Sequence, residues 1–108
     1  MRMDDDKDLI TDKVDEDLEL LARHLLMLQA IHDNGPIGII RLSEILGVPK
    51  HKIRYSLRLL EKDGAILPSQ DGAVVTDTYD AYMHQMSDYL KKLESTVKEL
   101  ESIMSKTL

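Results

Sequence analysis

The sequence predicts a mainly α-helical protein with one small β-hairpin and a long carboxyl-terminal helix. Three observations support this fold class. Two short amphipathic segments meet at a tight turn that contains Gly47 and Pro49. An Asp71-Gly72 pair separates two short apolar runs, which is typical of a hairpin. Beyond Asp77 the chain has no Gly or Pro, and its apolar residues recur in heptads.

The amino-terminal part is predicted to contain an acidic arm followed by one helix. Residues 1–15 are dense in charge and almost without core-forming side chains, so we expect a disordered arm. A first helix is expected from about Glu16 to Asp33, where Asn34-Gly35-Pro36 ends it. Its main apolar stripe consists of Leu18, Leu21, Leu25 and Leu28. Other apolar residues widen this stripe, which favours burial on several sides.

The central domain, residues 16–76, is predicted to contain two further helices joined by a turn. The first is short and ends at Gly47, because glycine readily adopts the left-handed conformation that closes a helix. Its apolar side is formed by Leu42, Ile45 and Leu46. Proline is tolerated in a first helical turn, so the second helix is expected from Pro49 to Asp63, before Gly64.

The helix over residues 49–63 has one apolar side and one cationic side. At 100° per residue, Ile53, Leu57 and Leu60 cluster together and are expected to face the core. The opposite side carries His51, Tyr55, Arg58 and Lys62, with Lys52 and Arg54 on its flanks. Such a surface can pair with phosphates and bring side-chain tips to base edges, although a merely solvated charged face is the commoner case.

A hairpin is expected next, from the runs Ala65–Pro68 and Ala73–Thr76. The segment Pro36-Ile37-Gly38 is a candidate for a short extended piece that pairs with it. The hairpin loop contains no Lys or Arg. Two interpretations therefore stay open: a wing that contacts DNA, and a hairpin that only covers the core.

Residues 77–108 are predicted to form a dimerisation helix. Its apolar residues alternate at spacings of four and three, which defines a heptad seam. The seam consists of Tyr79, Met83, Met86, Leu90, Leu93, Val97, Leu100 and Met104. A lone helix of this kind would leave its seam in water, so we expect it to pair as a coiled coil with the same helix of a second subunit. The sequence does not decide between parallel and antiparallel pairing.

Composition narrows the class of protein. The 108 residues include no Cys, which excludes disulfides, thiolate metal sites and a cysteine nucleophile, and is compatible with a reducing cytosol. No apolar run approaches the roughly 20 residues of a membrane span. The acidic amino terminus also differs from a basic signal peptide. We therefore expect a soluble, cytoplasmic protein.

Charge is distributed unevenly, and this matters more than the net charge of −6. Residues 1–34 hold four Lys/Arg and ten Asp/Glu, whereas residues 69–108 hold four and seven. Residues 35–68 hold three acids and six cations, which are Arg41, Lys50, Lys52, Arg54, Arg58 and Lys62. Because salt screens exposed charges beyond about 8 Å, this local basic face can act on an otherwise acidic molecule.

The ordered residues Arg41 to Val48, followed by Ile53, Leu57, Leu60 and Gly64, resemble the winged helix-turn-helix transcriptional regulators. The resemblance is to the small dimeric type of bacteria and archaea, and covers roughly residues 18–80. It implies a homodimeric repressor or activator that binds double-stranded DNA at a pseudo-palindromic site. It implies base-reading roles for His51, Tyr55 and Arg58, and phosphate-binding roles for Lys50, Lys52, Arg54 and Lys62.

Functions other than DNA binding have weaker support in the sequence. The four histidines show no paired ligand spacing, and no phosphate-binding loop or catalytic grouping is recognisable, so we expect no metal, no cofactor and no catalysis. A protein-interaction adaptor that uses the same fold without DNA remains the main alternative, because of the acidic balance and the cation-free hairpin loop. A small-molecule sensor is a third possibility, but the sequence identifies no effector.

Overall fold

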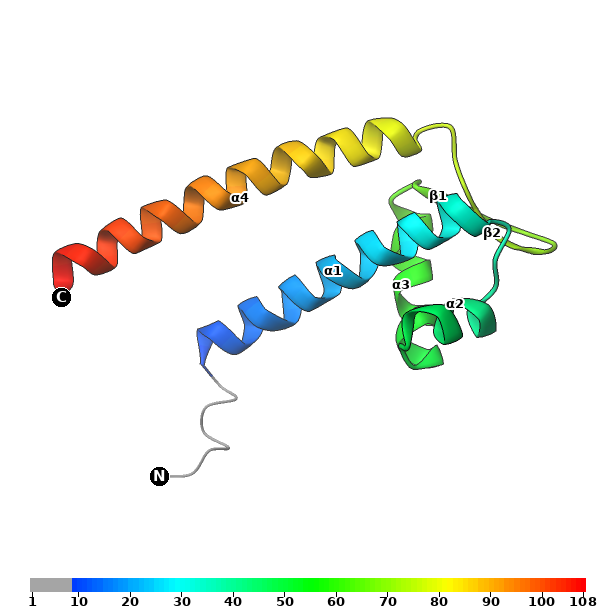
Figure 1. Ribbon diagram of the computed structural model, residues 1–108, viewed down its shortest axis with the longest axis horizontal. Coiled ribbons are helices and arrows are strands. Elements are labelled where there is room, and N and C mark those ends of the chain that lie inside the picture. Colours follow the sequence, from blue (N-terminus) through cyan, green and yellow to red (C-terminus); the bar gives the residue numbers. More distant parts are fainter. Residues whose placement is uncertain (1–8) are drawn as a thin grey trace, which may run out of the picture. The chain divides into compact units, whose positions relative to one another are not determined.

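The computed structural model describes residues 9–108 and is mainly helical, with a two-stranded antiparallel hairpin (Figure 1). The chain divides into two compact units, with the boundary between Thr76 and Asp77. In order, the elements are α1 (Ile10–Asn34), α2 (Ile39–Leu46), α3 (Lys50–Lys62), β1 (Ile66–Ser69), β2 (Gly72–Val75) and α4 (Tyr79–Thr107). The last helix makes up most of the second unit.

Helix α1 begins at Ile10, six residues before the predicted start at Glu16, so the prediction of an arm over residues 1–15 was wrong for its last six residues. Residues 1–8 lie outside the described part. Asp12 occupies the first turn, where a carboxylate interacts favourably with the positive end of the helix. Ile10 and Val14 also extend the apolar stripe of Leu18 at intervals of four residues. The acidic residues are therefore compatible with helix here.

The core of the first unit gathers around the carboxyl-terminal turns of α1. Of the predicted stripe on this helix only Leu28 is fully buried, whereas Leu18 is 43% exposed. The elements that cover α1 are short, with eight residues in α2 and thirteen in α3, so they reach only part of its length. The fully buried apolar side chains with at most 1% exposure are Met27, Leu28, Ile31, Leu42, Ile53, Leu60, Ala65 and Ile66.

Helix α3 is rotated slightly from the predicted orientation. Ile53 and Leu60 are fully buried, as expected, but Leu57 is only half-buried. Ser56 is fully buried instead. On a helical wheel Ser56 and Leu57 lie on opposite sides of Ile53. The side of α3 that faces the core therefore includes Ser56 and Ile53, and Leu57 lies at its edge.

The turn between α2 and α3 has the predicted form. Gly47 adopts a left-handed conformation with φ of 65°, and its N–H donates to the Ser43 carbonyl at 2.9 Å. The Ser43 hydroxyl donates to the Val48 carbonyl at 2.6 Å, which fixes the turn from its other side. Pro49 directly precedes the first helical residue, Lys50, and its carbonyl accepts the Ile53 N–H at 3.1 Å.

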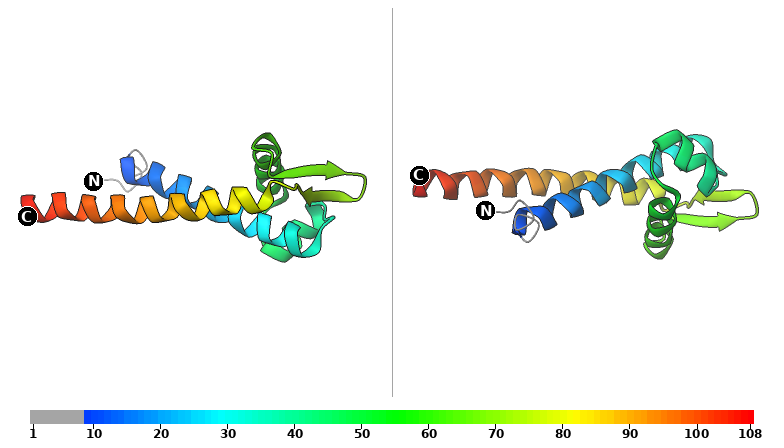
Figure 2. Two further views of the ribbon diagram at one scale, coloured as in Figure 1. Left: turned by 90° about the horizontal axis from the view of Figure 1, so that it is seen from above. Right: turned by 90° about the horizontal axis from the view of Figure 1, so that it is seen from below.

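The hairpin is also as predicted, and a third segment holds it. Ile66 pairs with Val75 and Ser69 with Gly72, and Figure 2 shows the two strands extending away from α3. Ile37 forms an antiparallel bridge with Ala73, with N–H to carbonyl distances of 3.1 and 2.8 Å. This confirms the expected pairing of the Pro36-Ile37-Gly38 segment, and it anchors the hairpin beside the start of α2.

Helix α4 has 29 residues, about 43 Å at 1.5 Å per residue, and contains no buried residue. On its seam Tyr79, Met83, Met86 and Leu93 are half-buried. The remaining seam residues, Leu90, Val97, Leu100 and Met104, are exposed. The heptad pattern therefore predicted the helix correctly, and the apolar seam is left without full burial.

The close approach of Gly72 to the Ile37 segment predicts a specific destabilising substitution. A Cβ at Gly72 would lie 2.6 Å from the Ile37 carbonyl oxygen and 2.8 Å from the Gly38 nitrogen, and φ is 128°. Gly72→Ala should lower the free energy of unfolding by about 1–3 kcal/mol, measured by urea denaturation. The control is Gly38→Ala, where a Cβ meets nothing within 4 Å. Equal effects of the two changes would contradict this view of the hairpin anchor.

Candidate nucleic-acid interface

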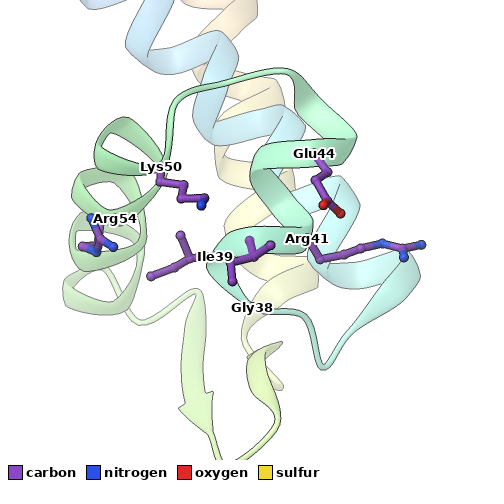
Figure 3. Close-up of a pocket in the computed structure, with 7 residues that line it drawn as sticks. Gly38, Ile39, Arg41, Glu44, Lys50 and Arg54 are labelled. Carbon is purple, nitrogen blue, oxygen red and sulfur yellow. The ribbon is translucent and has the colours of Figure 1, made fainter.

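A groove separates the start of α2 from the first two turns of α3 (Figure 3). It has a volume of about 560 Å³ and is open to solvent on one side. Its lining residues come from both helices and are Gly38, Ile39, Ile40, Arg41, Glu44, Lys50 and Arg54. In Figure 3 the Lys50 side chain projects from α3 towards α2. Three cations, one carboxylate and two isoleucines thus line the groove.

The amino-terminal end of α2 adds to the positive potential of the groove. The first turns of a helix carry backbone N–H groups without helical acceptors, and the helix dipole is positive there. Gly38 precedes the first helical residue, and no acidic residue occupies the first turn. Arg41 is the third residue of the same helix and so lies within this first turn. The start of α2 and the Arg41 guanidinium therefore both make the potential in the groove more positive.

The remaining predicted DNA-binding residues lie on α3 outside the groove lining. His51, Lys52, Tyr55, Arg58 and Lys62 are all exposed, while Ile53 and Leu60 on the other side of the helix are buried. Tyr55 is 46% exposed, so its ring is available to a partner. The structure thus brings Arg41, Lys50 and Arg54 together around one groove. The other five residues form an adjoining face on the same helix.

Sequence reasoning missed the apolar part of the groove lining, which consists of Ile39 and Ile40. Ile40 is 62% exposed. Its position became clear only in the structure, where α2 begins at Ile39. The signal in the sequence was the apolar pair Ile39-Ile40 directly after Gly38.

Helix α1, which contacts α3, contains a histidine with a lowered pKa, His24. Burial is the main cause that lowers the pKa of His24 from 6.5, and the nearby Arg23 charge acts in the same direction, while Asp63 opposes both. The Nε2 atom of His24 is buried and has no hydrogen-bond partner in the described part of the chain. The folded protein therefore favours the neutral imidazole.

Comparison of the sequence with protein-family models and with curated proteins gives no match. Within residues 9–108, no helix is long and apolar enough to cross a membrane. The same residues bring together no group of three or more His, Cys, Asp or Glu side chains with the arrangement of a metal site. The groove and the exposed face of α3 are therefore the surfaces that bear on function.

The lowered pKa of His24 predicts a pH dependence of stability. The unfolded chain takes up a proton near pH 6.5 and the folded protein only at lower pH, so stability should fall as the pH drops below 6.5. Urea denaturation at several pH values above about 5, where most carboxylates stay ionised, measures this effect. His24→Gln should flatten the dependence, whereas His51→Gln, at an exposed site on α3, should not. Identical profiles for wild type and His24→Gln would contradict the assignment.

Proposed function

We propose that this protein is a winged helix-turn-helix regulator that binds double-stranded DNA, with α3 as the recognition helix. The main support is the cationic groove, whose lining includes the three cations Arg41, Lys50 and Arg54 and one carboxylate, Glu44. The net charge of the whole chain is −6, so this local excess of positive charge runs against the composition. An anionic partner with regularly spaced charges fits such a surface.

The dimensions of α3 suit a DNA groove. Thirteen residues give a length of about 20 Å, and a helix with side chains is about 10–12 Å across, close to the roughly 12 Å width of the major groove. In this arrangement His51, Tyr55 and Arg58 face base edges. Arg41, Lys50, Lys52, Arg54 and Lys62 would then contact phosphates on either side.

The hairpin has a supporting role in this proposal. Its turn contains Gln70 and Asp71 and no cation, so nothing in it favours insertion into the negatively charged minor groove. Its bridge to Ile37 instead holds the chain just before α2. We therefore assign the hairpin to positioning of the groove, and not to base recognition.

Dimerisation through α4 would explain its exposed seam. Four of its eight seam residues are exposed, which leaves an apolar stripe that a second copy could cover. Two recognition helices in a symmetric dimer would meet half-sites about 34 Å apart, one turn of DNA. A pseudo-palindromic site is the expected target.

A protein-interaction adaptor is the second candidate function. It is favoured by exposed apolar side chains on the first unit, in particular Ile40, Tyr55 and Leu67. Such residues can anchor a protein partner whose acidic groups meet the same cations. This candidate predicts no salt-dependent affinity for any duplex.

Selection of bound sequences from a random pool of duplexes tests the proposed function. A sequence-specific regulator should enrich a two-fold symmetric motif, and its affinity should fall steeply as salt rises. Absence of enrichment, together with no salt-dependent binding to any duplex, would reject DNA recognition and favour the adaptor.

Two substitutions on α3 separate base reading from phosphate binding. Arg58→Ala should weaken binding to the selected duplex by about 1–3 kcal/mol, with a much smaller effect on an unrelated duplex, because a base contact is lost. Lys52→Ala should weaken both duplexes alike and reduce the salt slope by about one. Fluorescence anisotropy measures both constants. No effect of either change would show that this side of α3 does not contact DNA.

Substitutions on the α4 seam test dimerisation without DNA. Replacing Leu90 and Val97 with Asp places charges on the proposed interface and should convert the dimer to a monomer of 12.3 kDa in analytical ultracentrifugation. Ser95→Asp changes an exposed residue that lies off the seam on the same helix, and should leave the dimer intact. A monomeric wild type, or a variant that stays dimeric, would contradict the interface.

A further inference from the structure

Ser56 is a polar residue on the buried side of α3. It lies beside Ile53 and Leu60 on the side of the helix that packs into the core, and its exposure is 0%. Among residues 9–108 it is the one buried polar or charged residue. A hydroxyl in such surroundings is costly unless a hydrogen-bond partner reaches it. Its partner is therefore informative about how α3 is held.

The partner comes from α1. The Arg23 Nε donates a hydrogen bond to the Ser56 Oγ at 2.8 Å, across 33 positions of sequence. Arg23 is half-buried, so its guanidinium keeps part of its hydration while its Nε satisfies the buried hydroxyl. A hydrogen bond from a charged donor is stronger than one between neutral groups. The contact thus joins the middle of α3 to a fixed point on α1.

This hydrogen bond restricts rotation of α3 about its own axis, which apolar packing restricts less strongly. Contacts of Ile53 and Leu60 have little directional preference, whereas a hydrogen bond weakens steeply when its angle or length changes. A rotation of α3 by about 20° moves a side-chain tip at the roughly 6 Å outer radius of the helix by about 2 Å. Such a displacement exceeds the tolerance of a base contact.

We propose that Arg23 is a positioning residue for the exposed face of α3, acting through Ser56 to set the rotation of this helix. The inference rests on the proposed DNA binding, because it concerns which contacts α3 makes there. Base-edge hydrogen bonds require donor–acceptor distances of about 2.7–3.2 Å, while phosphate attraction persists to about 8 Å. Loss of the bond therefore lowers sequence discrimination more than general affinity for DNA.

Ser56→Ala tests the proposal with the smallest change, since it removes the acceptor, keeps every charge and suits a helix. The probes are a duplex selected by the wild type from a random pool and an unrelated duplex of the same length. The affinity for the selected duplex divided by that for the unrelated duplex should fall roughly tenfold. A loss of this size is expected when one base contact is weakened. Affinity for the unrelated duplex and its salt slope should not change. An unchanged ratio, or an equal loss on both duplexes, overturns the proposal.

Arg23→Met and the double variant Arg23→Met/Ser56→Ala supply the matched control. If the two residues act through one bond, each single change and the double change should lower the ratio by a similar factor. If they act separately, the factors should multiply to roughly a hundredfold, which would overturn the proposal. Circular dichroism of each variant shows whether the helices remain folded.

A measurement without DNA separates this inference from the proposed function. Residual dipolar couplings of backbone amides report the orientation of α3 relative to α1 in the free protein. Ser56→Ala should change the couplings of α3 while those within α1 keep their relative values. Unchanged couplings of α3 overturn the positioning role even if the wild type binds DNA. Changed couplings support it even if the wild type selects no duplex.

Discussion

The packing of α3, α2 and the hairpin on the carboxyl-terminal turns of α1 is the constraint on which the rest of the first unit depends. Helix α1 contacts α2, α3 and β2. Met27, Leu28 and Ile31 are its fully buried side chains. Burial of each contributes about 1.5–3 kcal/mol as an upper estimate. Because α2 and α3 are short, neither would keep its position without this surface.

The same packing explains why the groove has a defined shape. Ile37 pairs with Ala73 in the hairpin, and Gly38 directly afterwards precedes the first residue of α2. The hairpin therefore fixes the backbone just before α2, and with it the positions of Ile39, Ile40 and Arg41. On the other side of the groove, the burial of Ile53 and Leu60 and the hydrogen bond from Arg23 to Ser56 hold the helix that carries Lys50 and Arg54. The cations are exposed, but the backbone that carries them is held by core contacts.

Features that depend on neighbours in sequence could be predicted. Gly47 and Pro49 marked the turn, Asp71-Gly72 marked the hairpin, and the heptads of α4 marked a long helix, because each signal is local. The pairing of Ile37 with the hairpin, observed at Ala73, was the one predicted feature that joins residues far apart in sequence. The earlier start of α1 was missed, since an acidic stretch was taken for an arm although carboxylates stabilise a helix start.

Apart from the pairing of Ile37 with the hairpin, features that depend on distant contacts could not be predicted. The wheel of α3 placed Leu57 in the core, whereas Ser56 is buried there, with a partner 33 residues away in α1. The groove depends on the packing of α2 against α3, so the pair Ile39-Ile40 alone could not show that these residues line it. The exposed seam of α4 shows that a heptad repeat predicts a helix and an apolar stripe, but the partner that covers the stripe is not encoded in the spacing.

We propose that the groove and the outward side of α3 contact DNA. Titration of isotope-labelled protein with a selected duplex, followed through amide chemical shifts, locates the contact surface residue by residue. We expect the largest changes in the first turn of α2 and at His51, Tyr55 and Arg58 on α3. Changes confined to α4 or the hairpin, or no changes at all, would contradict this proposal.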